Sequence, residues 1–127
     1  MEKYGFSGYV VKYDVKNATG DIISKDAFKN IDGKIVPLIY NFQHCNSDSI
    51  LGYAMLEIRD DGIYCNGVFN DSPYSALCKE NNINGLGIYA NNIKRDGDYI
   101  KSGDIKYISI LPEDKKVHPD YKIEKWD

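Results

Sequence analysis

The sequence predicts a mainly β domain of about six antiparallel strands with one main helix. Three observations predict this fold class. Short runs rich in Val, Ile and Tyr recur along the chain, Gly, Asn and Asp turn residues separate them, and one main segment carries the start signal and spacing of a helix. Because no linker or repeat divides the 127 residues, we expect one domain over 1–127, with a charged tail from about residue 113.

The first third of the chain predicts two strands and a short turn of helix. Residues 8–15 alternate in the manner of a half-buried strand and end at a run of turn residues. Ser24 is placed to cap a single helical turn that buries Phe28. Residues 35–40 are apolar on both faces, which suits a covered strand, although Pro37 lacks an amide hydrogen and favours an edge or a bulge.

The middle of the chain predicts a β-hairpin. Residues 50–58 and 62–69 are two β-rich runs joined by "RDDG". The Asp61-Gly62 dipeptide is typical of a tight turn, so these two runs are expected to pair with each other.

A helix of about ten residues is expected next. Ser72 is its candidate cap and Pro73 its first residue, since proline is well tolerated there. The apolar side chains expected on one face are Tyr74, Leu77 and Cys78. Residues 85–99 and 104–111 then predict two more strands around Gly and Asp turns.

Composition excludes several functions. The formal net charge is −3, the pI is near 5.3, and acidic and basic residues are interspersed, so nucleic acid is not an expected partner. No stretch reaches the roughly 20 apolar residues of a membrane span, and the polar start lacks a signal core, so we expect a cytosolic protein. The cysteines Cys45, Cys65 and Cys78 lack metal-ligand spacing and are expected to be reduced thiols. No cofactor, metal or disulfide is expected.

His44 directly follows an apolar strand. Taken alone, such a histidine is most often a partly buried ring whose nitrogen bonds a backbone carbonyl. A catalytic base would also need a nucleophile within hydrogen-bond reach and a third group that fixes its tautomer.

The order of the segments supplies a context for His44. The stretches "GYVVKYD", "GDIISKDAF", "VPLIYNFQH", "ILGYAMLEIRDDGIYCNGVF", "INGLGIYANN" and "IKYISIL" resemble, in this order, the prohead protease family of tailed bacteriophages, over roughly residues 7–113. That family is similar to the herpesvirus capsid assemblin. The resemblance implies a mainly β fold with flanking helices, a herpesvirus-protease-like barrel of about six to seven antiparallel strands. In this fold a catalytic histidine ends a strand and a later strand carries a serine nucleophile.

The resemblance assigns three site positions. His44 matches the catalytic base, and Ile50, Gly52 and Ala54 match the strand that follows it. The stretch "GLGIY" places Gly87 where the family pattern "GLSIG" has its nucleophilic serine, and "YISIL" places Tyr107 where the family often has an acidic third member. Glycine has no oxygen to activate, and a phenol with a pKa near 10 orients an imidazolium poorly.

Other residues could substitute for the missing nucleophile. Ser109 follows Tyr107 on the same face of its expected strand, but it is more often an ordinary strand hydroxyl. Cys45 neighbours His44, yet adjacent residues of an extended strand point to opposite faces. Ser102 is interpreted as a turn residue and Cys78 as core packing.

Gly85 and Gly87 are expected to share one face of their strand. Without side chains there, a substrate backbone or a neighbouring ring could approach closely. A bulge or a tight barrel corner explains the two glycines equally well.

Three hypotheses for function follow. The favoured one is a phage or prophage capsid-assembly protein with a catalytically inactive prohead serine protease fold, which binds a peptide of scaffold or capsid protein. It would act in the cytoplasm of a bacterial host and inside the procapsid, and a homodimer is a candidate assembly. The alternatives are an active maturation protease with a displaced nucleophile, and an unrelated small β-barrel binding module.

Overall fold

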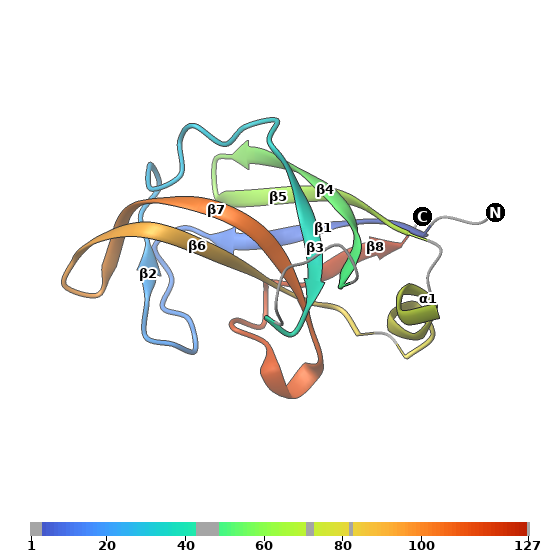
Figure 1. Cartoon of the computed structure of the whole chain (residues 1–127). Coiled ribbons are helices and arrows are strands. Elements are labelled where there is room, and N and C mark those ends of the chain that lie inside the picture. The colour runs from blue at the N-terminus through green and yellow to red at the C-terminus, as the bar shows by residue number, and fades with distance from the viewer. Residues whose placement is uncertain (1–3, 43–48, 71–72, 82, 127) are drawn as a thin grey trace.

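The computed structural model describes residues 4–42, 49–70, 73–81 and 83–126. Figure 1 shows a strongly twisted sheet whose strands curl around a common core, with the helix at one end. The strands are β1 Tyr4–Lys12, β2 Ile22–Ile23, β3 Ile35–Tyr40, β4 Ile50–Arg59, β5 Gly62–Phe69, β6 Gly85–Asp96, β7 Tyr99–Leu111 and β8 Ile123–Trp126. The helices are α1, Pro73–Glu80, and a short 3-10 helix, η1, Glu113–Lys115.

The mainly β class is confirmed, but the predicted antiparallel barrel is wrong in two respects. The sheet has eight strands in the order β2-β7-β3-β4-β5-β1-β8, with β6 paired to β7. β7 pairs in parallel with both β2 and β3, so the sheet is mixed. Turn signals reveal pairs of consecutive strands, and they carry no information on pairings between distant strands.

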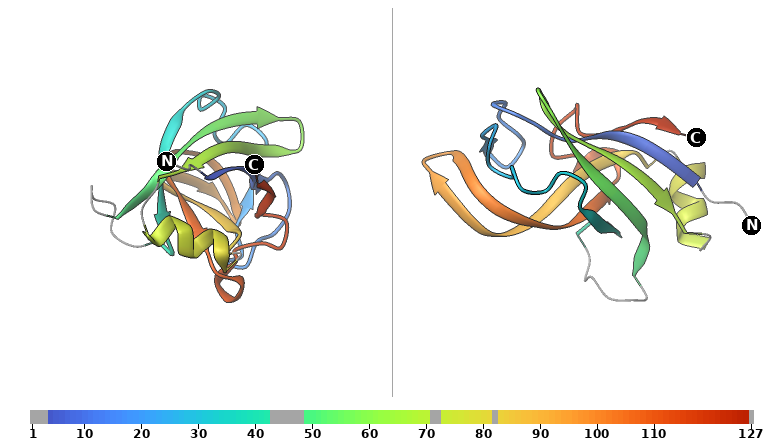
Figure 2. Two further views of the ribbon diagram at one scale, coloured as in Figure 1. Left: turned by 90° about the vertical axis from the view of Figure 1, so that its right-hand side faces the viewer. Right: turned by 90° about the horizontal axis from the view of Figure 1, so that it is seen from above.

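The sheet also does not close into a barrel. Its two ends meet at one isolated bridge, between Gly85 of β6 and Lys122 before β8. Two backbone bonds flank this bridge, from Leu86 N–H to the Tyr121 carbonyl and from Ile123 N–H to the Asn84 carbonyl. Beyond Leu86 the strand β6 continues into a long hairpin with β7, which projects from the end opposite α1 (Figure 2). The contact between the start of β6 and the segment before β8 is too short to form the ladder that would close a barrel.

The expected hairpin is confirmed. β4 pairs with β5 in continuous antiparallel register from Gly52–Phe69 to Arg59–Gly62. The turn residues are Asp60 and Asp61, so Gly62 belongs to the strand. A Cβ on Gly62 would lie 2.1 Å from the Val11 carbonyl oxygen of β1, which explains the glycine by close approach.

The first strand departs from simple alternation. Its register with β5 shifts between Tyr9 and Val11, and both Val10 and Val11 are fully buried. A bulge of this kind turns two successive side chains inward, which the expected period of two excluded.

The C-terminal half of β3 lies between two strands, β4 and β7. Its parallel ladder with β7 begins at Leu38, one residue after Pro37. The irregularity expected near Pro37 lies between Leu38 and Ile39, where the register with β4 shifts. Proline is therefore accommodated before β3 acquires its second neighbour.

The helical turn expected after Ser24 does not form. The region after Ser24 consists of hydrogen-bonded turns, with Ala27 N–H bonded to the Ser24 carbonyl and Ile31 N–H to the Phe28 carbonyl. The Ser24 hydroxyl is buried and has no hydrogen-bond partner, so it is not a cap. Phe28 is nevertheless buried as expected. The segment is too short to repay the cost of helix nucleation.

Helix α1 begins at Pro73, as predicted, and spans 8 residues. The candidate cap Ser72 and the side chain of Tyr74 lie outside the described part of the structure. Cys78 is buried, whereas Leu77 is 51% exposed, so the expected apolar face is wrong for Leu77.

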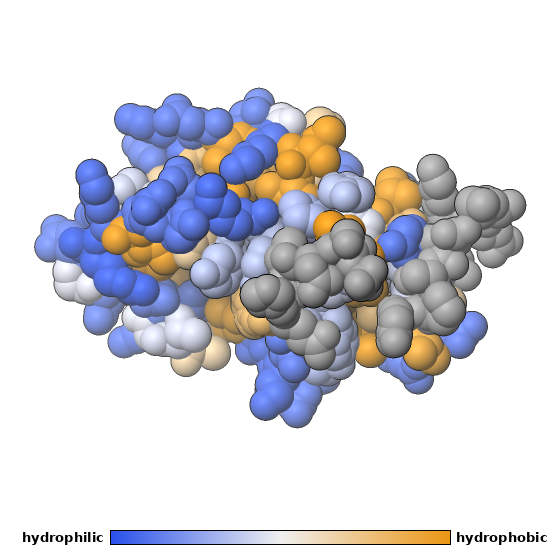
Figure 3. Space-filling model, in the orientation of Figure 1, coloured by the Kyte–Doolittle hydropathy of each residue, from blue (hydrophilic) through white to orange (hydrophobic). Residues whose placement is uncertain are grey.

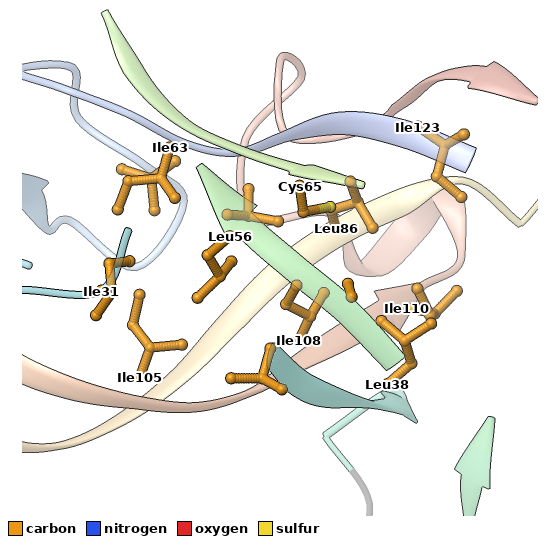
Figure 4. Packing of buried hydrophobic residues seen from close by; sticks show 14 of the residues in the cluster. Ile31, Leu38, Leu56, Ile63, Cys65, Leu86, Ile105, Ile108, Ile110 and Ile123 are labelled. Carbon is orange, nitrogen blue, oxygen red and sulfur yellow. The ribbon is translucent and has the colours of Figure 1, made fainter. Parts of the chain in front are cut away.

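The core lies on the inner faces of the strands, where aliphatic side chains dominate (Figure 4). At one end of the core, the rings of Phe6, Phe69 and Trp126 contact one another. The ring centroid of Phe69 is 5.0 Å from that of Phe6 and 5.8 Å from that of Trp126. Because Trp126 belongs to β8, which pairs with β1, the charged tail ends in a docked strand.

Burial of Cys65 in this core predicts sensitivity to alkali. Desolvation raises the pKa of the Cys65 thiol from 9.0 to about 12. Above pH 9 the unfolded thiol loses its proton while the folded thiol keeps it. The free energy of unfolding should therefore fall by about 1.4 kcal/mol per pH unit between pH 9 and pH 12 from this group. Urea titrations across this pH range should show a shallower decline for Cys65→Ala, and equal slopes would contradict the prediction.

Candidate functional site

Gly87 lies in β6 directly opposite Ser109 of β7. Their strand neighbours Leu86, Ile108 and Ile110 belong to the main core. Because successive residues of a strand point to opposite faces, Gly87 and Ser109 lie on the other face of the β6–β7 pair. The residue pairing therefore brings together the predicted nucleophile position and one of its two candidate substitutes.

A sharp turn at the end of β3 meets this face. Asn41 and Phe42 have φ angles of 47° and 55°, both in the left-handed region. Asn41 N–H donates to the Ile110 carbonyl at 2.9 Å, and Phe42 N–H donates to Ser109 Oγ at 2.8 Å. These two bonds hold the chain against β7 two residues before His44.

The backbone does not require glycine at position 87. A Cβ built there would lie 3.1 Å from Phe42 Cζ and 3.2 Å from Leu111 Cδ1, which are both side-chain ends. At Gly85, by contrast, a Cβ would lie 2.7 Å from the Leu111 carbonyl oxygen. The register is regular at both glycines, and the nearest shift lies between Tyr89 and Ala90. Neither glycine marks a bulge, and the end of the Phe42 ring lies close to Gly87.

Tyr107, at the third-member position, is almost buried. Its ring stacks on that of Tyr89, with centroids 4.8 Å apart and an interplanar angle of 7°. Tyr107 and Ser109 share one face of β7, as expected from their spacing. Gly87, Tyr107 and Ser109 thus lie next to one another on one face of the β6–β7 pair.

Two predicted site residues, His44 and Cys45, lie outside the described residues, and their positions relative to Gly87 stay predictions. Ser102 lies within β7, and the expected turn at this residue is wrong. Cys78 is buried in α1, where burial raises the pKa of its thiol, as suits a packing role.

A hollow of about 220 Å³ opens beside Gly87. Four consecutive residues of β6, from Gly87 to Ala90, line it. The opposite wall comes from the loop before β2 and the segment before β8. The other lining residues are Asn17, Thr19, Asp21, Ile23, Phe28, Phe42, Ile93, Ile100, Val117 and Tyr121. Most of this lining is apolar, so the hollow suits an apolar side chain.

Charge in the hollow comes from Asp21. The Arg95 side chain, which forms an ion pair and hydrogen bond with Asp21, lowers the pKa of this carboxyl group, and the Thr19 hydroxyl adds to the effect. Asn17 Oδ1 accepts hydrogen bonds from the amides of Thr19 and Asp21 and so fixes the loop. The sequence predicted these loop residues only as a turn.

The edge of β6 faces this hollow. Leu86 N–H donates to the Tyr121 carbonyl at 2.8 Å, on the side of β6 opposite β7. Residues two apart in an antiparallel strand direct their amide and carbonyl groups to the same side. The backbone groups of Ile88 therefore point toward the hollow, where an extended peptide could continue the pairing that Tyr121 begins.

A larger and more open hollow, of about 470 Å³, lies between Lys16–Ala18 and Glu113–Pro119. Lys116 is paired there with Glu113 at 2.7 Å, and His118 Nδ1 accepts a hydrogen bond from the Asp120 amide. Val117 borders both hollows, but Gly87 lines only the smaller one.

Within the described parts of the chain, no group of three or more His, Cys, Asp and Glu side chains could hold a metal ion. In the same residues, no helix combines the length and apolarity that a membrane crossing requires.

Comparison with known proteins identifies a structural neighbour. No protein-family model matches the sequence, and no curated protein matches it. The fold is similar to the crystal structure of KSHV protease in complex with a hexapeptide phosphonate inhibitor, with a TM-score of 0.54 and 10% sequence identity. The match covers 86% of this chain, which spans only 59% of that structure. The chain therefore has a herpesvirus-protease-like fold.

Proposed function

We propose that the chain is a capsid-assembly protein of a phage or prophage, with a prohead protease fold that no longer cleaves and instead binds a peptide of scaffold or capsid protein. The observation that carries the proposal is glycine at position 87. The backbone there would accept a side chain, yet the position opposite Ser109 has no nucleophilic atom.

The likeness in fold supports the protease-like part of the proposal. The segment order that resembles the prohead protease family supports the setting in capsid assembly. Loss of a nucleophile abolishes acyl transfer but need not affect substrate binding, so a binding function can outlast catalysis.

The hollow beside β6 supports a peptide ligand. An extended segment would pair with the backbone of Ile88 and place one apolar side chain against Phe42 and Val117. A space of about 220 Å³ suits one large side chain.

Co-expression tests this binding. The chain should copurify with the scaffold or major capsid protein of its own phage. Ala90→Trp, which fills the hollow, should weaken the complex at least about tenfold. Lys94→Trp is the matched control, because Lys94 is exposed on the same strand and does not line the hollow. The proposal would be refuted if the wild-type chain copurified with neither the scaffold nor the major capsid protein, or if the two variants bound equally well.

The alternative is an active protease that uses Ser109. Ser109 is fully buried, and its Oγ accepts the Phe42 amide hydrogen. Attack on a substrate requires an accessible oxygen, so this geometry favours a structural hydroxyl. A fluorophosphonate adduct on the wild-type chain that Ser109→Ala and His44→Ala both abolish would establish the alternative and overturn inactivity.

A further inference from the structure

The chain between η1 and β8 forms a hydrogen-bonded turn at residues 118–121. Tyr121 N–H donates to the His118 carbonyl at 3.1 Å and so joins the fourth residue of the turn to the first. Pro119 is the second residue, and its ring fixes the φ angle near about −65°, which suits this position. Asp120, the third residue, donates its amide hydrogen to His118 Nδ1 at 3.0 Å. These four residues are here named the 118–121 turn.

The 118–121 turn lies where the two ends of the sheet meet. At its end, the Tyr121 carbonyl accepts the amide hydrogen of Leu86 in β6 at 2.8 Å. One residue before its start, the Val117 carbonyl accepts the amide hydrogen of Ala18 at 2.7 Å. The turn therefore connects two backbone attachments, one to β6 and one to the loop before β2.

The ring of His118 is largely covered but still borders water. Its side chain is 16% exposed, and the ring stacks on that of Tyr121 with centroids 4.9 Å apart and an interplanar angle of 28°. Figure 3 shows the nearby residues of η1 as a hydrophilic projection at the lower edge of the molecule. A proton can therefore reach the ring, and a rotation of the ring would disturb its contact with Tyr121.

The hydrogen bond from the Asp120 amide requires a neutral imidazole. A ring nitrogen accepts only through its lone pair, and protonation converts both ring nitrogens into donors. The Asp120 carboxylate offers an alternative partner, because its Oδ2 lies 3.9 Å from His118 Nδ1. A protonated ring would exchange the backbone amide for this carboxylate, so the turn would lose the bond that holds its third residue.

Other ionisable groups surround the ring of His118. The charged residues that line the same hollow of about 470 Å³ are Lys16, Glu113 and Lys116. Lys116 pairs with Glu113 at 2.7 Å, and Lys16 lies 4.0 Å from the Asp98 carboxylate. Burial raises the pKa of Tyr121, so its phenol stays uncharged around neutral pH. The charges that line the hollow therefore largely cancel.

We propose that the 118–121 turn is a pH-sensitive clasp between β6 and the segment before β8. A neutral His118 keeps the clasp closed. Protonation, which histidine ordinarily undergoes between about pH 8 and pH 5, opens the clasp and weakens the bond from Leu86 to Tyr121. Because Val117 and Tyr121 line the smaller hollow, opening also changes the shape of that hollow. The clasp itself is independent of the proposed function, and only its effect on a bound peptide rests on that function.

The variant His118→Asn separates the hydrogen bond from the charge. The same pattern occurs elsewhere in this chain at Asn17, whose Oδ1 accepts the amide hydrogen of Thr19, two residues on, at 3.0 Å. His118→Asn should therefore keep the turn closed and remove its response to pH. His118→Ala, which lacks the acceptor, should leave the turn open at every pH.

Amide hydrogen exchange, measured by NMR at about pH 7.5 and about pH 5.5, tests the clasp. In the wild-type chain the protection factor of the Leu86 amide should fall about fivefold or more at the lower pH, because one neutral hydrogen bond of the turn is lost. The amide of Leu56, which donates to the Lys34 carbonyl, is the internal control and should keep its protection. His44→Gln, which removes the other histidine of the chain, should behave like the wild type.

Equal protection of Leu86 at the two pH values in the wild-type chain would overturn the proposal. A fall that persists in His118→Asn, or a parallel fall at Leu56, would overturn it too, because another group or the whole fold would then respond to acid. Full protection of Leu86 in a folded His118→Ala at about pH 7.5 would also contradict it. If His118→Ala fails to fold, His118→Asn still decides the outcome. Because no peptide is added, failure of the proposed function would leave these results unchanged.

Discussion

Gly52→Ala is expected to lower the free energy of unfolding by about 3 kcal/mol or more. A Cβ at Gly52 would lie 2.1 Å from the Val68 carbonyl oxygen and 2.8 Å from Phe69 Cα. The φ angle of 152° is also one that side chains rarely adopt. Both obstacles are backbone, so β4 and β5 would have to separate where they cover the core. Urea denaturation measures the change.

Gly87→Ala is the matched control, because it also adds one methyl group to a strand glycine. The nearest atoms at Gly87 are side-chain ends that can move by a few tenths of an ångström. We expect a change below about 1 kcal/mol. If Gly52→Ala were equally mild, the close approach of β4 and β5 would be contradicted.

Gly87→Ser is expected to convert the chain from inert to reactive toward a fluorophosphonate probe. The serine Cβ fits with small shifts of Phe42 and Leu111, and it would stand beside the turn that leads to His44. A positioned histidine base contributes about 10²–10⁴ in rate, so labelling should rise at least about 100-fold over wild type. Intact-mass spectrometry at neutral pH would measure the adduct.

The control for this gain is Gly87→Ser combined with His44→Ala. Removal of the base should reduce labelling about 100-fold or more. An adduct that forms equally fast without His44 would show that the serine reacts unaided, and the assignment of His44 as the base position would fail. Absence of any adduct in Gly87→Ser would directly contradict the expected pairing of position 87 with His44.

Local signals predicted most of the elements. The "RDDG" turn identified the β4–β5 hairpin, and Pro73 identified the start of α1. These features depend on contacts between residues that are close in the sequence. The parallel pairs of β7 with β2 and β3 depend on distant contacts, for which turn chemistry holds no information.

The candidate site was predictable in part. Strand spacing placed Tyr107 and Ser109 on one face, and the structure adds that Gly87 lies opposite Ser109. The role of Phe42 could not be predicted. Asn41 and Phe42 both have positive φ angles, and a bulky aromatic residue rarely adopts one, so the sequence gives no sign of this turn. Only the backbone bond to Ser109 and the packing beside Gly87 reveal it.

The position of β1 has a consequence for how the chain reaches its native state. β1 is flanked by β5 and by β8, so Phe6 is paired with both Gly67 and Trp126. β1 thus acquires its second neighbour only after residue 126, more than a hundred residues later, has left the ribosome. Contacts of such long sequence separation are entropically expensive to form, which places the completion of this edge among the slow events of folding.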